Sequence, residues 1–122
     1  MAVASAATVQ AFVSQKTLAL VGVSRSGKKF GNAILKELSK KGYTVYPVHP
    51  EVESIDGVTC YRSLTDLPSE VGGVVLVVKP EQTMNVVQDA HAAGIGRVWF
   101  QQGSENADAL AYCRQNGIDT VS

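Results

Sequence analysis

Apolar runs and amphipathic stretches alternate along this chain. Residues 17–23 form a continuous apolar run, and shorter apolar runs cover residues 43–48, 73–78, 97–100 and 118–121. Continuous apolar runs of this length are typical of strands that are covered on both faces, as in parallel sheets. The pattern therefore predicts five strands in one sheet.

The stretches between these runs have the spacing of helices. Residues 29–41 place Phe30, Ile34 and Leu38 on one face, and Gly42 follows as a stop signal. A helix over residues 80–93 begins with a proline, which suits a first turn. A further helix is predicted over residues 104–116 because Ser104 can cap it.

Strands that alternate with helices of this length predict βαβ units. We expect an α/β fold, namely a three-layer, Rossmann-like, doubly wound parallel sheet of about five strands with helices on both faces. The chain, residues 1–122, has the length of one domain, with a leading helix within residues 1–14. Residues 51–70 have no regular pattern apart from a helical turn near Leu64. Because the last strand starts just before residue 122, we expect the C-terminal end to be incomplete.

Composition narrows the partners. The 11 basic and 11 acidic side chains cancel, which argues against nucleic acid or an anionic membrane as a partner. The start of the chain lacks a basic segment followed by a long apolar one, and no apolar run approaches the roughly 20 residues that span a bilayer. Cys60 and Cys113 lie far apart without metal-ligand spacing, so a reduced, cytoplasmic protein is expected.

The loop after the first strand carries the candidate chemistry. In open parallel sheets, ligands bind beyond the carboxyl ends of the strands. A helix that starts there offers free N–H groups and a dipole that favours an anion. The loop adds hydroxyl donors from Ser24 and Ser26 and positive charge from Arg25, Lys28 and Lys29. We predict that it binds phosphate, with Gly22, Val23, Ser24, Arg25, Ser26 and Lys28 as the site residues.

Two familiar phosphate motifs come close in this loop, and both are incomplete. Residues 22–28 match the first part of a Walker A loop, but Lys29 stands where a magnesium-binding Ser or Thr is needed. The dinucleotide fingerprint has Ser24 in place of its middle glycine, and the acidic residue expected after the second strand is absent. These departures argue against a P-loop NTPase, and they also argue against NAD as the ligand of this loop. An NADP-like ligand stays open, since Arg25 or Lys28 could meet a ribose phosphate.

Several segments together resemble the small CoA-binding domain proteins, which are similar in fold to the CoA-binding domain of the succinyl-CoA synthetase α subunit. The resemblance runs from about residue 15 to residue 121. It rests on the segments LVGVS at 20–24, KxFG at 28–31, GYxV at 42–45, YPVHP at 46–50 and VWFQQGS at 98–104.

The resemblance implies a coenzyme A site on three loops. Residues 22–28 would hold the phosphates, residues 47–50 would line the adenosine, and residues 77–80 would border the pantetheine arm. The implied contacts include Pro47, His49, Pro50, Val78, Lys79 and Pro80. His49 departs from the family pattern, which commonly has asparagine there, although both side chains can hydrogen-bond.

Gln101 and Gln102 follow the fourth strand at the same edge of the sheet, where they could bind ligand or pair with loop backbone. The phosphorylated histidine of the synthetase lies on a second domain, and a second domain is not expected in these 122 residues. We identify no pair of residues suited to acid–base catalysis, and we interpret His91 as a residue on the surface of a helix. The prediction is a non-catalytic module for CoA or acyl-CoA, either a homodimer or the partner of an acyl-CoA enzyme. The alternatives are an NAD(P)-binding regulator or small oxidoreductase, and an interaction subunit of a larger ligase.

Overall fold

Five parallel strands pair in the order β2-β1-β5-β6-β7 in this computed structural model, which describes residues 6–22, 30–49, 51–55, 57–67, 71–101 and 103–121. Their bounds are β1 (Thr17–Val21), β2 (Thr44–Val48), β5 (Gly73–Leu76), β6 (Arg97–Phe100) and β7 (Asp119–Val121). The helices are α1 (Ala6–Val13), α2 (Phe30–Lys40), α3 (Pro80–Ala92) and α4 (Ala107–Gln115). The predicted doubly wound α/β fold is confirmed.

Side chains of successive strand residues point to opposite faces of the sheet, and they build two separate cores. Ala19, Val74 and Leu76 pack on one face with residues of α3 and α4. Leu18 and Val75 pack on the other face with residues of α1 and α2. The central strand β5 is buried at every position, which explains why its sequence is a continuous apolar run.

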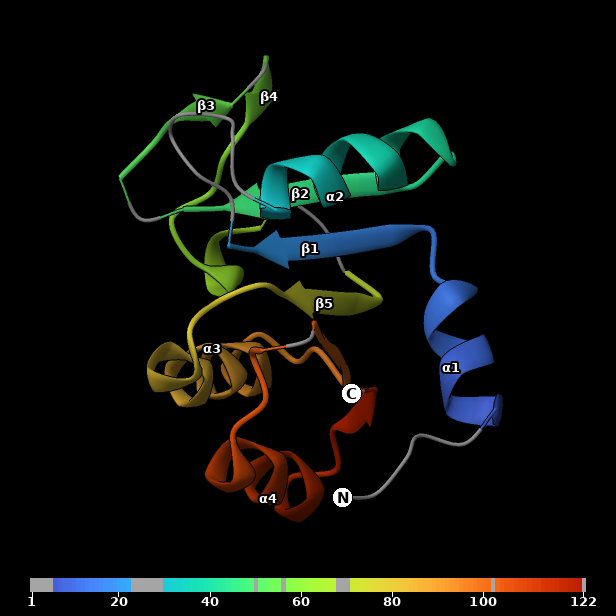
Figure 1. Ribbon diagram of the computed structural model, residues 1–122, viewed down its shortest axis with the longest axis vertical. Coiled ribbons are helices and arrows are strands. Elements are labelled where there is room, and N and C mark those ends of the chain that lie inside the picture. The colour runs from blue at the N-terminus through green and yellow to red at the C-terminus, as the bar shows by residue number, and fades with distance from the viewer. Residues whose placement is uncertain are drawn as a thin grey trace.

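All neighbouring strands of this sheet pair in parallel, so their carboxyl ends lie at one edge of the sheet. Figure 1 shows this for β2, β1 and β5, whose arrows point the same way. The chain moves outward from β1 to β2 and then returns past β1 to β5, and this reversal makes the boundary between β1 and β5 the topological switch point. The helix α1 lies at the opposite, amino end of β1 (Figure 1). The edge strand β2 tolerates Pro47, because an edge strand does not need every ladder donor.

The predicted irregular stretch contains more structure than expected. The short strands β3 (Ser54–Ile55) and β4 (Val58–Thr59) pair antiparallel around Gly57, which has a φ of 79°. Strands of two residues show no periodic pattern, so the sequence did not reveal them. The predicted turn near Leu64 is a 3₁₀ helix, η1 (Leu64–Asp66).

The predicted start of the last helix is wrong. The helix α4 begins at Ala107, because the side chain of Asn106 accepts hydrogen bonds from the N–H groups of Asp108 and Ala109. Ser104 is buried instead, where it has a different set of partners.

Candidate functional site

The switch point is built on a close approach between the ends of β1 and β5. Gly22 follows β1 with a φ of 128°, and a Cβ atom there would lie 2.7 Å from the carbonyl carbon of Val77. The Val77 N–H donates to the Val21 carbonyl at 2.8 Å, so the two strand ends stay paired to this point. Only glycine combines this backbone conformation with this contact. The loop predicted to bind phosphate therefore starts from a sharply defined position.

A pocket of about 420 Å³ opens beside this point, on the α3 face of the sheet. Its floor includes Val21 and Val48, the last residues of β1 and β2, and Val78, which lies two residues past the end of β5. Polar side chains surround this apolar floor: Arg62 from the segment before η1, and Gln82, Asn85 and Asp89 from α3. A mostly apolar pocket with a few polar groups at a switch point is the usual form of a small-molecule site.

His49 is held at the end of β2 by a neighbouring segment. Tyr61 pairs alongside Val48, since its N–H donates to the Pro47 carbonyl at 2.9 Å and its carbonyl accepts from the His49 N–H at 2.8 Å. The Nδ1 atom of His49 accepts a hydrogen bond from the Glu51 N–H at 3.0 Å. Since Nδ1 is an acceptor, the ring proton lies on Nε2, which can donate to a ligand oxygen.

The loop after β5 is braced from below by the loop after β6. The hydroxyl of Ser104 accepts from the Val78 N–H at 3.0 Å and lies 2.9 Å from the Val78 carbonyl. The Asn106 side chain donates to the Pro80 carbonyl at 2.9 Å, and the Thr83 hydroxyl donates to the Ser104 carbonyl at 2.6 Å. The Thr83–Ser104 bond is buried and the two bonds at Val78 are partly buried, so together these bonds restrain the backbone of the Val78–Pro80 segment.

The structure brings part of the predicted site together. Gly22, His49 and Val78 are half-buried at the three neighbouring strand ends, and Lys79 and Pro80 are exposed where α3 begins. Pro47 is buried within β2, which leaves its backbone for any contact. Gln101 follows β6 and lies apart from this pocket, against a different one. The predicted residues Val23, Ser24, Arg25, Ser26, Lys28 and Pro50 lie outside the described residues.

The sequence analysis missed the polar wall of the pocket. Gln82, Asn85, Val86 and Asp89 follow the spacing i, i+3, i+4 and i+7, which places them on one face of α3. The sequence shows this spacing, but it does not show which face of α3 lies against the carboxyl ends of the strands. Arg62 carried no signal, because its segment has no regular pattern.

The two cysteines are buried and free. Burial raises the pKa of the Cys113 thiol to about 11, and burial also raises the pKa of Cys60. Thiols are nucleophiles only as thiolates, so neither sulfur is activated. Among the described residues, no three side chains of His, Cys, Asp or Glu converge on a metal-sized site. None of the helices in the described ranges has the length and apolar character to cross a membrane.

The fold and the pocket at the carboxyl edge of the sheet place this domain in the class of doubly wound α/β domains, in which ligands bind at the switch point. The family profile described as CoA binding domain matches residues 16–122. The chain belongs to this family, and the resemblance found in the sequence is confirmed.

Three comparisons place the chain within the family. It is 32% identical over 115 residues to the ADP-forming acetate–CoA ligase II of Archaeoglobus fulgidus, covering 84% of this chain and 17% of the ligase. A hypothetical protein from Pyrococcus horikoshii OT3 superposes with a TM-score of 0.88 and 36% identity, covering 94% of this chain and 81% of that one. The dinucleotide-forming acetyl-coenzyme A synthetase 1 of Ca. Korarchaeum cryptofilum superposes with a TM-score of 0.76 and 25% identity, covering 86% of this chain and 25% of the synthetase.

The similar proteins are of two sizes. The chain spans 11–17% of the length of four archaeal acetate–CoA ligases or ligase subunits with which it aligns. It spans 81% of the hypothetical protein from P. horikoshii. The same domain thus occurs both within large ligases and in proteins of nearly this size.

Proposed function

We propose that this domain binds coenzyme A at the carboxyl edge of its sheet. The observation that carries the proposal is the family match over residues 16–122, combined with a pocket at the switch point of that same segment. The residues present suit the ligand, because the pocket offers an apolar floor for an adenine ring and a cation, Arg62, for a phosphate.

The order of the strands supports a direction for the ligand. The adenosine would lie by β2, against Val48 and His49, and the phosphates would lie by Gly22 and the loop that follows it. The pantetheine arm would then pass the end of β5, beside Val78 and Lys79. This order follows the sheet from its edge inward, so one extended ligand can contact all three loops. Ser24, Arg25, Ser26 and Lys28 remain the predicted phosphate contacts.

The proposed role is to hold the ligand without transforming it. Both thiols are buried and protonated at neutral pH, and one nitrogen of His49 is already engaged by backbone. Relatives that contain this domain are named acetate–CoA ligases, and the domain is a small share of each. We therefore propose that the chain presents CoA or acyl-CoA to a partner enzyme that carries out acyl transfer.

Isothermal titration calorimetry with CoA, dephospho-CoA, NAD and NADP tests the proposal. CoA is expected to bind in the micromolar range, about −8 kcal/mol. Dephospho-CoA is expected to bind more weakly, because a charged contact is lost. If CoA gives no heat while NADP binds, the CoA proposal is wrong and the NAD(P)-binding alternative replaces it.

A further inference from the structure

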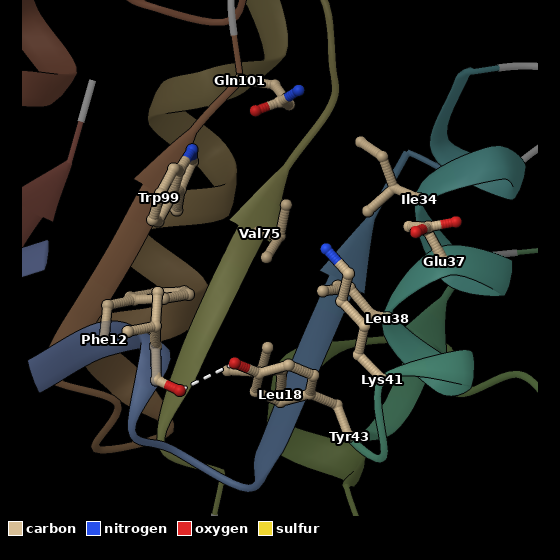
Figure 2. Close-up of a pocket in the computed structure, with 11 residues that line it drawn as sticks. Phe12, Leu18, Ile34, Glu37, Leu38, Lys41, Tyr43, Val75, Trp99 and Gln101 are labelled. Carbon is tan, nitrogen blue, oxygen red and sulfur yellow. Dashed lines mark hydrogen bonds between the residues drawn. The ribbon is translucent and has the colours of Figure 1, made fainter. Parts of the chain in front are cut away.

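A second hollow lies on the other face of the sheet, between α1 and α2, and its volume is about 310 Å³ (Figure 2). The strands β1, β5 and β6 form its floor, and its apolar lining consists of Phe12, Leu18, Ile34, Leu38, Val75 and Trp99. Here it is called the acyl groove. Its two charged side chains are Glu37 on α2 and Lys41, the first residue after α2.

The acyl groove is closed at the amino end of the sheet. The Tyr43 hydroxyl donates a hydrogen bond to the Val13 carbonyl at 2.7 Å, which joins the end of α1 to the residue before β2 (Figure 2). Phe12 packs on the floor, edge to face with Trp99 at a centroid distance of 5.3 Å. The bulk of Phe12 fits because Gly73 lies beneath it, where a Cβ atom would lie 2.5 Å from the ring.

The acyl groove opens at the carboxyl edge, between Ile34 and Gln101 (Figure 2). Gln101 directly follows β6, and its N–H donates to the Leu76 carbonyl at 3.0 Å. The mouth of the acyl groove is therefore on the same edge of the sheet as Gly22. Two strand spacings separate β1 from β6, which is about 10 Å.

This shape selects a narrow, apolar occupant. A packed helix is about 10–12 Å across, and the Tyr43–Val13 hydrogen bond closes the amino end of the groove to an occupant of that length and width. The volume of about 310 Å³ matches the small end of the range for small-molecule pockets. A hydrocarbon chain entering past Gln101 fits the closed end, the apolar floor and the size together.

We propose that the acyl groove holds the acyl chain of a CoA thioester, with the thioester beside the Gln101 amide. The inference rests on the proposed binding of CoA and adds the class of ligand, namely acyl-CoA with a medium-length apolar chain. The ligand would follow the strand order β2-β1-β5-β6 and then turn down the sheet face. Complete burial of one methylene is worth about fourfold in affinity.

A chain-length series on the full chain tests the proposal. Calorimetric Kd values are measured for CoA and for its acetyl, butyryl, hexanoyl and octanoyl thioesters. We expect the affinity to rise by about two- to fourfold per methylene, since the acyl groove buries part of each group. Trp99 is the single tryptophan, so its fluorescence should change with octanoyl-CoA and much less with CoA.

Two substitutions separate the acyl groove from the CoA site. Leu38→Trp fills the groove from α2 and should abolish the chain-length dependence while the Kd for CoA itself stays unchanged. If Leu38→Trp does not fold, Ile34→Trp, which lies nearer the mouth of the groove, provides the same test. Ser39→Trp places the same bulk at an exposed position on the next residue of α2 and should keep the wild-type dependence.

The outcomes are distinct. If CoA binds and the five ligands have equal Kd values, or the longer chains bind more weakly, the acyl groove takes another occupant and this inference is wrong, while CoA binding stands. If no CoA species binds, the proposed function itself is wrong. Chain-length dependence that survives both Leu38→Trp and Ile34→Trp places the acyl chain elsewhere and also overturns the inference.

Discussion

Replacing Gly22 by alanine tests the geometry on which the whole site depends. The added Cβ atom would lie 2.7 Å from the Val77 carbonyl carbon and 2.8 Å from the Val77 Cβ. Backbone cannot rotate away as a flexible side chain can, so β1 and β5 must separate at their ends. The φ of 128° adds conformational strain for any residue with a side chain.

The expected loss of stability follows from these two effects. A residue forced into the left-handed region costs about 1–2 kcal/mol, and overpacking costs about 1–3 kcal/mol. Gly22→Ala should therefore lower the free energy of unfolding by about 2–5 kcal/mol, and the Tm by about 8–20 °C for a domain of this size. Gly42→Ala is the matched control, because Gly42 has a φ of 92° but nothing within 4 Å of the added atom. It should lose only the conformational part, about 1–2 kcal/mol.

Thermal and urea unfolding of both variants, followed by circular dichroism, measure this difference. Calorimetry with CoA then shows whether the displaced loop still binds ligand, and we expect at least a tenfold weaker Kd for Gly22→Ala. The reasoning is refuted if Gly22→Ala is no less stable than Gly42→Ala and binds CoA like the wild type. That result would mean that the contact with Val77 relaxes without consequence.

Three further changes test other parts of the molecule. Ser104→Ala leaves the Val78 N–H without its partner, so it should lower the free energy of unfolding by about 1–3 kcal/mol and weaken CoA binding. Ser14→Ala, at an exposed hydroxyl, is the control and should change the free energy of unfolding by less than about 0.5 kcal/mol. Equal effects of the two substitutions would contradict the bracing role of Ser104. Arg62→Ala should weaken the binding of CoA more than that of dephospho-CoA in calorimetry, and an equal loss for both would show that Arg62 does not contact the 3′-phosphate, the group that dephospho-CoA lacks. Because burial raises the pKa of Cys113 from 9.0 to about 11, its contribution to stability is complete below pH 9 and is lost as the pH rises towards 11. Between pH 8 and pH 10.5 the wild type should lose about 2 kcal/mol more than Cys113→Ala in urea unfolding, and parallel losses would refute the assignment.

The sequence was sufficient to predict the main helices and strands and the fold class, because a central strand that is buried on both faces requires a continuous apolar run. It predicted β6 at residues 97–100 and the start of α3 at Pro80 as the structure has them. It failed at the start of α4, since Ser104 and Asn106 are both good caps and only packing decides between them. The hydroxyl of Ser104 is drawn into the interior by the Val78 backbone, a contact 26 residues away in the chain.

What the sequence determined by itself was local and periodic: the alternation of strand and helix, the glycine after the first strand and the family that these segments resemble. The tertiary structure decided which strand ends are neighbours, and so which distant residues share a pocket. Arg62, Asn85 and Val21 meet only because β1 lies between β2 and β5. The acyl groove likewise exists only because α1 and α2 leave a strip of the sheet between them. Such juxtapositions depend on the order of strands in space, and no local pattern along the chain encodes that order.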